Sequence, residues 1–251
     1  MVKIEIIYSD DDIAVVNKPP GIAVHGQLIT GSGIKTRRKR VLEFKPVPEK
    51  TLVDFLVERF PELKLVGDDP VHRPGIVHRL DKDTSGVMVV ARNQESFKVL
   101  KNLFKSRLVE KIYWAVVCGI MSRKQGEVSL PMGRLARNPL KRGVVEGRSK
   151  IKGAREAMTE YRVLKTAQGY SLVELRPKTG RMHQLRVHLK ALGHPVACDR
   201  LYGGKNVCCP EGVNRQLLHA RSLSFSFPEG RRLYFETEPP DDFALALEKI
   251  F

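Results

Sequence analysis

The stretch Val77-His78-Arg79-Leu80-Asp81-Lys82-Asp83-Thr84-Ser85-Gly86 runs directly into the apolar segment Val87–Ala91, and it constrains the fold more than any other part of the chain. Proline and glycine upstream force a turn, and the β-branched residues downstream predict a buried strand. We therefore expect Asp81 on a loop at the edge of a core strand, where a rigid scaffold positions it. Arg79 and Lys82 flank Asp81, and nearby cations favour an ionised carboxylate, which can act as a nucleophile.

Two other interpretations of this stretch stay open. The run from Asp81 to Gly86 is also typical of an ordinary polar turn, in which Asp and Ser bond to their own backbone and Gly takes a positive φ. The pair Asp81 and Asp83 also resembles a metal-binding DxD motif. The first interpretation makes the loop structural, and the second makes it a metal-dependent transfer site.

The charge of the chain indicates a polyanionic partner. The 251 residues include 44 Lys and Arg against 28 Asp and Glu, for a net charge of +16. Nucleic acid is the first candidate, and a membrane surface is the second, although no long basic amphipathic helix is apparent. Two basic segments, residues 26–50 and 131–155, are interpreted as loops that could contact phosphates.

Nothing in the sequence predicts export or membrane insertion. The first residues alternate like a strand and lack an apolar signal region, and the apolar run Ile112–Ile120 is too short to span a bilayer. The four cysteines lack a CxxC spacing, so we expect reduced thiols in a cytoplasmic protein, with neither disulfides nor a zinc site.

The pattern of elements predicts an α+β fold with a mixed, largely antiparallel sheet. Thr51 and Asn93 are expected to cap two helices. Thr179 is expected to cap a third, in which Met182 belongs to the buried face and which ends at Gly193. No interdomain linker is evident, so the prediction is one domain over residues 1–251.

Residues His78–Gly86 closely resemble the signature of the RluA-type pseudouridine synthases. Asn17–His25 resembles the N-terminal motif of this family, Lys111–Ala115 its tyrosine motif, and Thr179–His188 its third motif. The downstream segments that also fit are Leu192–Val196, Asp199–Gly203 and Leu218–Ala220. The motifs occur in family order and cover nearly the whole chain, which makes the resemblance highly specific.

The resemblance implies the pseudouridine synthase catalytic fold, with helices and loops around a central cleft. The sequence departs from the larger family members, and we expect a single domain without an N-terminal S4-like module. It implies conversion of specific uridines in tRNA or ribosomal RNA to pseudouridine, with RNA as the partner and without cofactor or metal. We expect a monomer that does not bind membranes. The alternative is a non-catalytic RNA-binding protein that retains the fold.

The family also implies roles for individual residues. Asp81 would be the catalytic carboxylate, Arg186 would form the ion pair that orients it, and Tyr113 would pack on the target base. Arg79 would fill the space left by the extruded uridine. The other residues expected to contact RNA or the base are Lys18, His78, Arg181, His183 and Gln184. Tyr113 has a structural alternative, as a strand tyrosine that is buried for packing.

Overall fold

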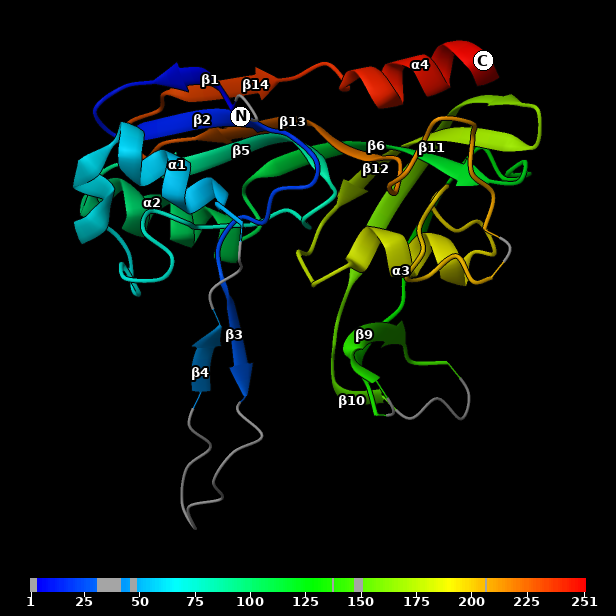
Figure 1. The fold of residues 1–251 in the computed structure, drawn as a ribbon, viewed down its shortest axis with the longest axis horizontal. Coiled ribbons are helices and arrows are strands. Elements are labelled where there is room, and N and C mark those ends of the chain that lie inside the picture. Colours follow the sequence, from blue (N-terminus) through cyan, green and yellow to red (C-terminus); the bar gives the residue numbers. More distant parts are fainter. Residues whose placement is uncertain (1–3, 31–41, 46–48, 137, 147–150, 206) are drawn as a thin grey trace. The chain divides into compact units, whose positions relative to one another are not determined.

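The computed structural model describes residues 4–30, 42–45, 49–136, 138–146, 151–205 and 207–251 (Figure 1). The chain divides into two compact units, one made of Met1–Asp83 and Met88–Asn102 and the other of Thr84–Val87 and Leu103–Phe251. Each unit is described by itself. The expectation of one catalytic domain over residues 1–251 stays a prediction.

The first unit combines a small sheet with two short α-helices. Its strands are β1 (Glu5–Ser9), β2 (Ile13–Lys18) and most of β5 (Ser85–Ala91), in the order β1-β2-β5, and a hairpin of β3 (Gln27–Thr30) and β4 (Leu42–Lys45). Its helices are α1 (Leu52–Arg59), a 3-10 turn (Pro61–Leu65) and α2 (Gln94–Lys105). All seven residues of β5 are buried, as the apolar run in the sequence predicts.

Two predicted helix caps in this unit are confirmed. The Thr51 hydroxyl accepts the backbone N–H of Asp54 at 3.3 Å, and the Asp54 carboxylate accepts the backbone N–H of Thr51 at 2.7 Å, which completes a capping box. The Asn93 side-chain oxygen accepts the backbone N–H of Ser96 at 2.8 Å. These side chains satisfy backbone donors that would otherwise have no partner at the helix starts.

The second unit is built on a longer sheet. Its strands follow the order β5-β13-β6-β12-β11-β7, with β14 paired to β13, and only the β5–β13 pair in this unit is parallel among the residues described. The bounds are β6 (Glu110–Cys118), β7 (Gln125–Ser129), β11 (Met158–Ala167), β12 (Tyr170–Pro177), β13 (Leu218–Ser226) and β14 (Arg232–Glu236). The α-helices are α3 (Gln184–Ala191) and α4 (Asp241–Ile250). The predicted α+β class with a mixed, largely antiparallel sheet is confirmed.

The two helices of this unit pack on opposite faces of strand β6, because successive side chains of a strand point to opposite sides. Ala115 and Val117 share a buried cluster with Leu185 and Leu189 of α3. Val116, between them, shares a different cluster with Phe243, Ala246 and Ile250 of α4. Strand β6 is therefore covered on both sides, which explains its apolar sequence.

The expected basic loop at residues 131–155 is wrong. Its described residues form a three-stranded sheet in the order β10-β8-β9, with bounds Met132–Leu135 for β8, Asn138–Val144 for β9 and Ile151–Arg155 for β10 (Figure 1). Gly133 and Gly143 lie opposite each other, and a Cβ on Gly133 would lie 2.5 Å from Ile151. These glycines make room for packing across the sheet, a role that the sequence alone does not distinguish from a flexible turn.

The expected start of the third helix is also wrong. Helix α3 begins after His183, whose φ of 59° is left-handed, and not after Thr179. Met182 lies before the helix and is 45% exposed instead of belonging to its buried face. The predicted end is confirmed, because Gly193 follows the helix with a φ of 82°.

The expectation of reduced thiols is contradicted by two disulfides, Cys118–Cys208 and Cys198–Cys209. Sequence spacing hides this arrangement, because the segment before Cys198 meets the end of β6 through a bridge between Val117 and Val196, which are far apart in the sequence. The two bonds attach the segment that contains Cys208 and Cys209 to the end of β6 and to the residue before Asp199.

The described helices are short. The longest of them, α2, has 12 residues, and no helix within the described ranges is long and apolar enough to cross a membrane.

Reduction of the two disulfides is expected to lower the free energy of unfolding by about 2–4 kcal/mol for each bond. The Cys118–Cys208 bond closes 90 residues and the Cys198–Cys209 bond closes 11, so Cys208→Ser should destabilise more than Cys209→Ser. Guanidinium chloride unfolding with and without reductant measures the effect. Four titratable thiols in the unfolded, unreduced protein, with no effect of reductant, would contradict the bonds.

Candidate active site

The predicted site residues are divided between the two units. The first unit contains Lys18, His78, Arg79 and Asp81, and the second contains Tyr113, Arg181, His183, Gln184 and Arg186. The structure therefore describes two sets of interactions, each within its own unit. The ion pair of Arg186 with Asp81 stays a prediction.

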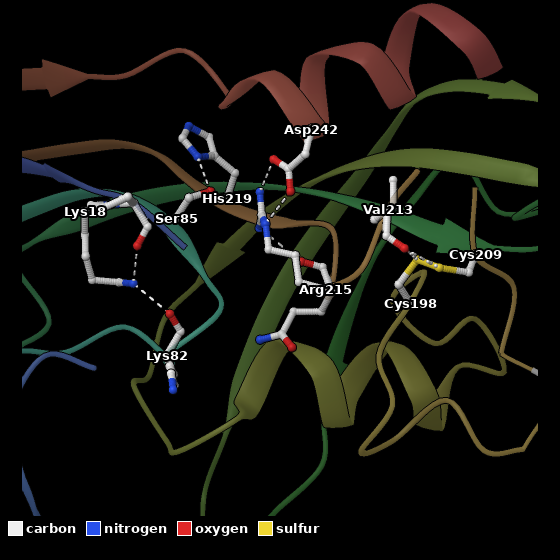
Figure 2. A network of polar contacts seen from close by, with 11 residues as sticks. Lys18, Lys82, Ser85, Cys198, Cys209, Val213, Arg215, His219 and Asp242 are labelled. Atoms are coloured by element: carbon white, nitrogen blue, oxygen red, sulfur yellow. Dashed lines mark hydrogen bonds and ion pairs between the residues drawn. A yellow bond between two sulfur atoms is a disulfide. The ribbon is translucent and has the colours of Figure 1, made fainter. Parts of the chain in front are cut away.

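Lys18 anchors the backbone of the Asp81 loop. Its side chain is completely buried, and Nζ donates to the backbone carbonyls of Pro19 at 2.8 Å, Ile22 at 3.0 Å and Lys82 at 2.9 Å (Figure 2). A buried ammonium is stable only when hydrogen bonds replace its water. The carbonyl of Lys82 directly follows Asp81, so Lys18 fixes the backbone beside the carboxylate. Its expected contact with RNA stays a prediction.

Arg79 is oriented by His25. The Arg79 guanidinium donates to Nε2 of His25 at 3.1 Å, and Nδ1 of His25 donates to the carbonyl of Gly26 at 2.5 Å. Burial lowers the pKa of His25 to about 4, so the imidazole is neutral and can accept from the arginine. Burial also lowers the pKa of Arg79, and the charge of Asp81 opposes that shift. Arg79 and Asp81 therefore interact within the first unit.

His78 supports the loop through β5. Its Nε2 accepts the backbone N–H of Val89 at 3.1 Å. This contact connects the loop to β5, and the expected role of His78 toward RNA stays a prediction.

The end of the signature is fixed within the second unit. Ser85 contacts Nδ1 of His219 at 3.0 Å (Figure 2). Nε2 of His219 contacts the carbonyl of Thr237 at 2.9 Å. Gly86 has a φ of 118°, and a Cβ there would lie 2.2 Å from the carbonyl oxygen of Ala220. Only glycine permits this close approach of two strands.

Tyr113 lies across strand β13 from Gly86. Ala220 of β13 is paired with Gly86 on one side and with Tyr113 of β6 on the other. Neighbouring strands are about 4.8 Å apart, so Tyr113 lies about 10 Å from the start of β5. The tyrosine is half-buried and packs against the cluster that contains Leu185 of α3.

Arg186 is held by a carboxylate that our sequence analysis did not assign. Its Nε donates to Asp199 at 2.7 Å and its Nη2 donates to the other carboxylate oxygen at 2.8 Å. Both residues are buried, Asp199 completely. Asp199 also accepts the backbone N–H groups of Leu201 at 3.0 Å and Tyr202 at 3.1 Å. This two-point geometry fixes the plane of the guanidinium.

Tyr202 connects Arg186 to the small sheet. Its ring lies 5.0 Å from the Arg186 guanidinium, and its hydroxyl contacts Nδ1 of His183 at 2.7 Å. The same hydroxyl accepts the backbone N–H of Arg142 in β9 at 3.0 Å, so its proton is available for His183. The left-handed backbone of His183 is thus stabilised by its side chain.

Gln184 stabilises the turn before α3. Its carbonyl oxygen accepts from the Thr179 hydroxyl at 2.7 Å and from the backbone N–H of Arg181 at 3.0 Å. Its amide nitrogen donates to the carbonyl of Met158 at 2.9 Å and to Thr159 at 3.0 Å. The Arg181 side chain donates to the carbonyl of Glu156 at 3.0 Å. The expected RNA contacts of Gln184 and Arg181 stay predictions.

The structure thus adds four supporting residues that sequence reasoning left without a role: His25, Asp199, Tyr202 and His219. All four lie inside the recognised motif segments, which was the available signal, but their partners are distant in sequence. Among the residues that the structure describes, no group of three or more His, Cys, Asp or Glu side chains could hold a metal ion.

Comparison with known proteins identifies a family that matches most of the sequence. Residues 12–191 match the family described as RNA pseudouridylate synthase, a range that includes Asp81, Tyr113 and Arg186.

Relatives match over most of the chain. An uncharacterized RNA pseudouridine synthase of Synechocystis sp. is 38% identical over 230 residues, which cover 90% of this chain and 62% of that protein. An uncharacterized RNA pseudouridine synthase of Aquifex aeolicus is 39% identical over 250 residues, covering 96% and 71%. Ribosomal large subunit pseudouridine synthase D of Neisseria meningitidis serogroup B is 37% identical over 248 residues, covering 95% and 59%. The chain thus spans less than two thirds of the Synechocystis and Neisseria proteins.

The fold is similar to that of solved human proteins. Human RNA pseudouridylate synthase domain containing 1 matches with a TM-score of 0.72 and 28% identity, over 95% of this chain and 84% of that chain. Human RNA pseudouridylate synthase domain containing 4 matches with a TM-score of 0.71 and 28% identity, over 97% and 92%.

Acid is expected to destabilise the protein through two buried histidines. Burial lowers the pKa of both His25 and His219 from 6.5 to about 4. The unfolded chain therefore takes up these protons first, so the stability is complete above about pH 6.5 and falls as the pH drops toward 4, by up to about 3 kcal/mol for each residue. Urea unfolding between about pH 7 and 5, where carboxylates titrate little, measures the loss.

His219→Asn should flatten this part of the pH dependence while it lowers the stability at neutral pH. Identical slopes for the wild type and the variant would contradict the neutral, buried state of His219.

Proposed function

Because the chain belongs to the RNA pseudouridylate synthase family, whose members are isomerases, we propose that it converts uridine in RNA to pseudouridine. The match over residues 12–191, which contains Asp81, Tyr113 and Arg186 together, carries this proposal. The surrounding contacts support it, because the residue directly after Asp81 and the side chain of Arg186 are each held by a buried group.

The reaction moves one bond and needs no co-reactant. The bond between N1 of uracil and C1′ of ribose breaks, the base rotates, and C5 bonds to C1′. N1 gains a proton and C5 loses one, so the mass is unchanged. Asp81 serves either as a nucleophile at C1′, displaced when C5 attacks, or as a base that removes and returns the 2′ proton. Unlike glycoside hydrolysis, neither route protonates a leaving oxygen with a second carboxylic acid.

Asp81 needs both an ionised carboxylate and a fixed position for this chemistry. Lys18 holds the carbonyl of the next residue, and Arg79 lies close enough to interact with the Asp81 charge. Arg186 supplies a second cation to Asp81 in this proposal. The bidentate contact with Asp199 fixes the guanidinium before substrate binds, so less reorganisation accompanies the reaction.

The uridine has to leave the base stack before Asp81 can reach C1′, which costs roughly a few kcal/mol. Tyr113 packs on the extruded base, and Arg79 occupies the space that it leaves. His25 presets the orientation of Arg79 for that role. Phosphate contacts on a chain with a net charge of +16 offset part of the extrusion cost.

The substrate is a tRNA or a ribosomal RNA. The Neisseria relative is named for the large ribosomal subunit, so we place RNA of that subunit first. The protein acts as a monomer in the cytoplasm. Disulfides are rare in the cytosol of most cells, although intracellular proteins of hyperthermophiles contain them. The assignment to the cytoplasm therefore rests on the proposed RNA substrate and not on the cysteines.

Asp81→Asn is expected to abolish pseudouridine formation and to leave RNA binding within about twofold, because the substitution removes the reactive charge and keeps the shape. Cells that lack the protein are complemented with the wild type or with the variant. Pseudouridine-specific labelling of ribosomal RNA and tRNA then identifies the modified position and its dependence on Asp81.

The variant Asp83→Asn is the matched control and should restore the modification. If the Asp81→Asn variant restored the modification at the wild-type rate, catalysis by the Asp81 carboxylate would be excluded. RNA binding without any modified position that depends on the wild-type protein would favour the non-catalytic alternative.

Asp199→Asn is expected to lower kcat about 100-fold with little change in KM, because Arg186 loses the partner that fixes its plane. It should also destabilise the protein by about 3–5 kcal/mol, since a buried guanidinium loses the charge of its bidentate partner. Asp242→Asn is the matched control, because Asp242 forms a similar bidentate pair with Arg215 at 2.6 and 2.7 Å (Figure 2). That variant should lose stability and keep kcat. Equal losses of kcat in both variants would show that Asp199 acts only through stability.

A further inference from the structure

The small sheet of the second unit carries three cations in one line. Lys152 of β10 is paired with Arg134 of β8, and Arg134 is paired with Arg142 of β9. Residues directly opposite each other on antiparallel strands project from the same face. We call these three side chains the cation row. With about 4.8 Å between strands, the row spans about 10 Å.

The face that carries the cation row continues into the protein core. Two residues along β8 and β9 from the row, Met132 is paired with Val144, on the same face. Met132 is buried in a cluster with Val187 of α3 and Tyr202, and Val144 packs against that cluster. One end of the face therefore packs next to the helix that contains Arg186, and the row lies at the other end.

The cation row places like charges opposite each other. Like charges directly opposite each other on neighbouring strands repel. Burial lowers the pKa of Arg142, and the charge of Arg134 lowers it further. Residues 131–155 contain eight Lys and Arg residues and a single acidic residue, Glu146. Arg134 and Lys152 are exposed, and Arg142 is half-buried, so the row is accessible to a ligand.

We propose that the cation row is a binding site for successive phosphates of the RNA backbone next to the target uridine. This inference rests on the proposed function and deepens it, because it assigns part of the substrate contact to these residues. A polyanion is the ligand that relieves repulsion along a line of cations, and a ribose-phosphate chain presents its charges in a line. The site makes no base-specific contact, so it contributes affinity and position but no sequence preference.

Contacts within the second unit connect the row to the candidate catalytic arginine. The backbone of Arg142 donates to the Tyr202 hydroxyl, and the Tyr202 ring contacts Arg186. The Arg142 guanidinium also contacts the sulfur of Met182, which precedes His183. Phosphates on the row would thus be held at a fixed distance from Arg186.

The test measures binding of a short fluorescein-labelled oligouridylate across a series of salt concentrations, in the Asp81→Asn background so that no turnover occurs. One variant carries Arg134→Gln, Arg142→Gln and Lys152→Gln. The control carries Lys98→Gln, Lys105→Gln and Lys249→Gln, which remove three exposed lysines from α2 and α4 and change the net charge equally. Thermal unfolding verifies that both variants are folded.

The slope of log K against log salt should fall by about 2 in the row variant, since each lost phosphate contact on a single strand contributes about 0.7. The control slope should stay near that of the parent. Equal slopes in the two variants would overturn the proposal, as would row-dependent binding of polyglutamate, which would indicate an acidic protein as the partner. Because binding is measured without catalysis, this result is independent of whether Asp81 performs the reaction.

Lys152→Glu separates binding from folding. It replaces a repulsion with an attraction beside Arg134, so the melting temperature should stay the same or rise while the affinity for oligouridylate falls about tenfold or more. A row retained for structural reasons would lose stability in this variant and keep its RNA affinity, which would overturn the proposal. Arg134→Gln alone supplies a second test if the triple variant is unstable.

Discussion

A guanidinium buried in the second unit requires a fixed counter-charge, and much of that unit is arranged to supply it. Arg186 is 6% exposed and Asp199 is not exposed at all, so both charges are removed from water, and their ion pair offsets part of that cost. Asp199 in turn depends on the backbone N–H groups of Leu201 and Tyr202. The position of a helical arginine is therefore set by a turn that lies 13 residues downstream.

The first unit holds a buried cation through backbone carbonyls. Lys18 donates to three backbone carbonyls, which are already ordered by the chain and carry no charge to titrate. This anchor connects strand β2 to the backbone directly after Asp81. Two histidines also support the signature without a charge, because burial keeps His25 and His219 neutral at physiological pH while they contact Arg79 and Ser85.

Local features of the structure could be predicted from the sequence, and features that depend on distant contacts could not. The capping side chains Thr51 and Asn93 act within three residues, and the buried strand β5 is a simple apolar run. Asp199 was recognised only as part of a motif, because its partner lies on another element. The disulfides of Cys208 and Cys209 depend on folding, which brings this segment to Cys118, 90 residues away in the sequence, and to Cys198. For the same reason, the sequence predicted a loop where Gly133 and Gly143 pack beneath Ile151.

The Tyr202 side chain contacts three segments of the second unit that are distant in the sequence. Its hydroxyl supports the backbone of β9 and the left-handed residue His183, while its ring contacts the Arg186 guanidinium. Strand β9, which contains Arg142, and helix α3, which contains Arg186, thus both contact Tyr202 within the second unit. A displacement of the small sheet would alter the contacts of Tyr202, and through them the environment of Arg186. An RNA backbone bound on that sheet would therefore be connected to the arginine through the contacts of one buried ring.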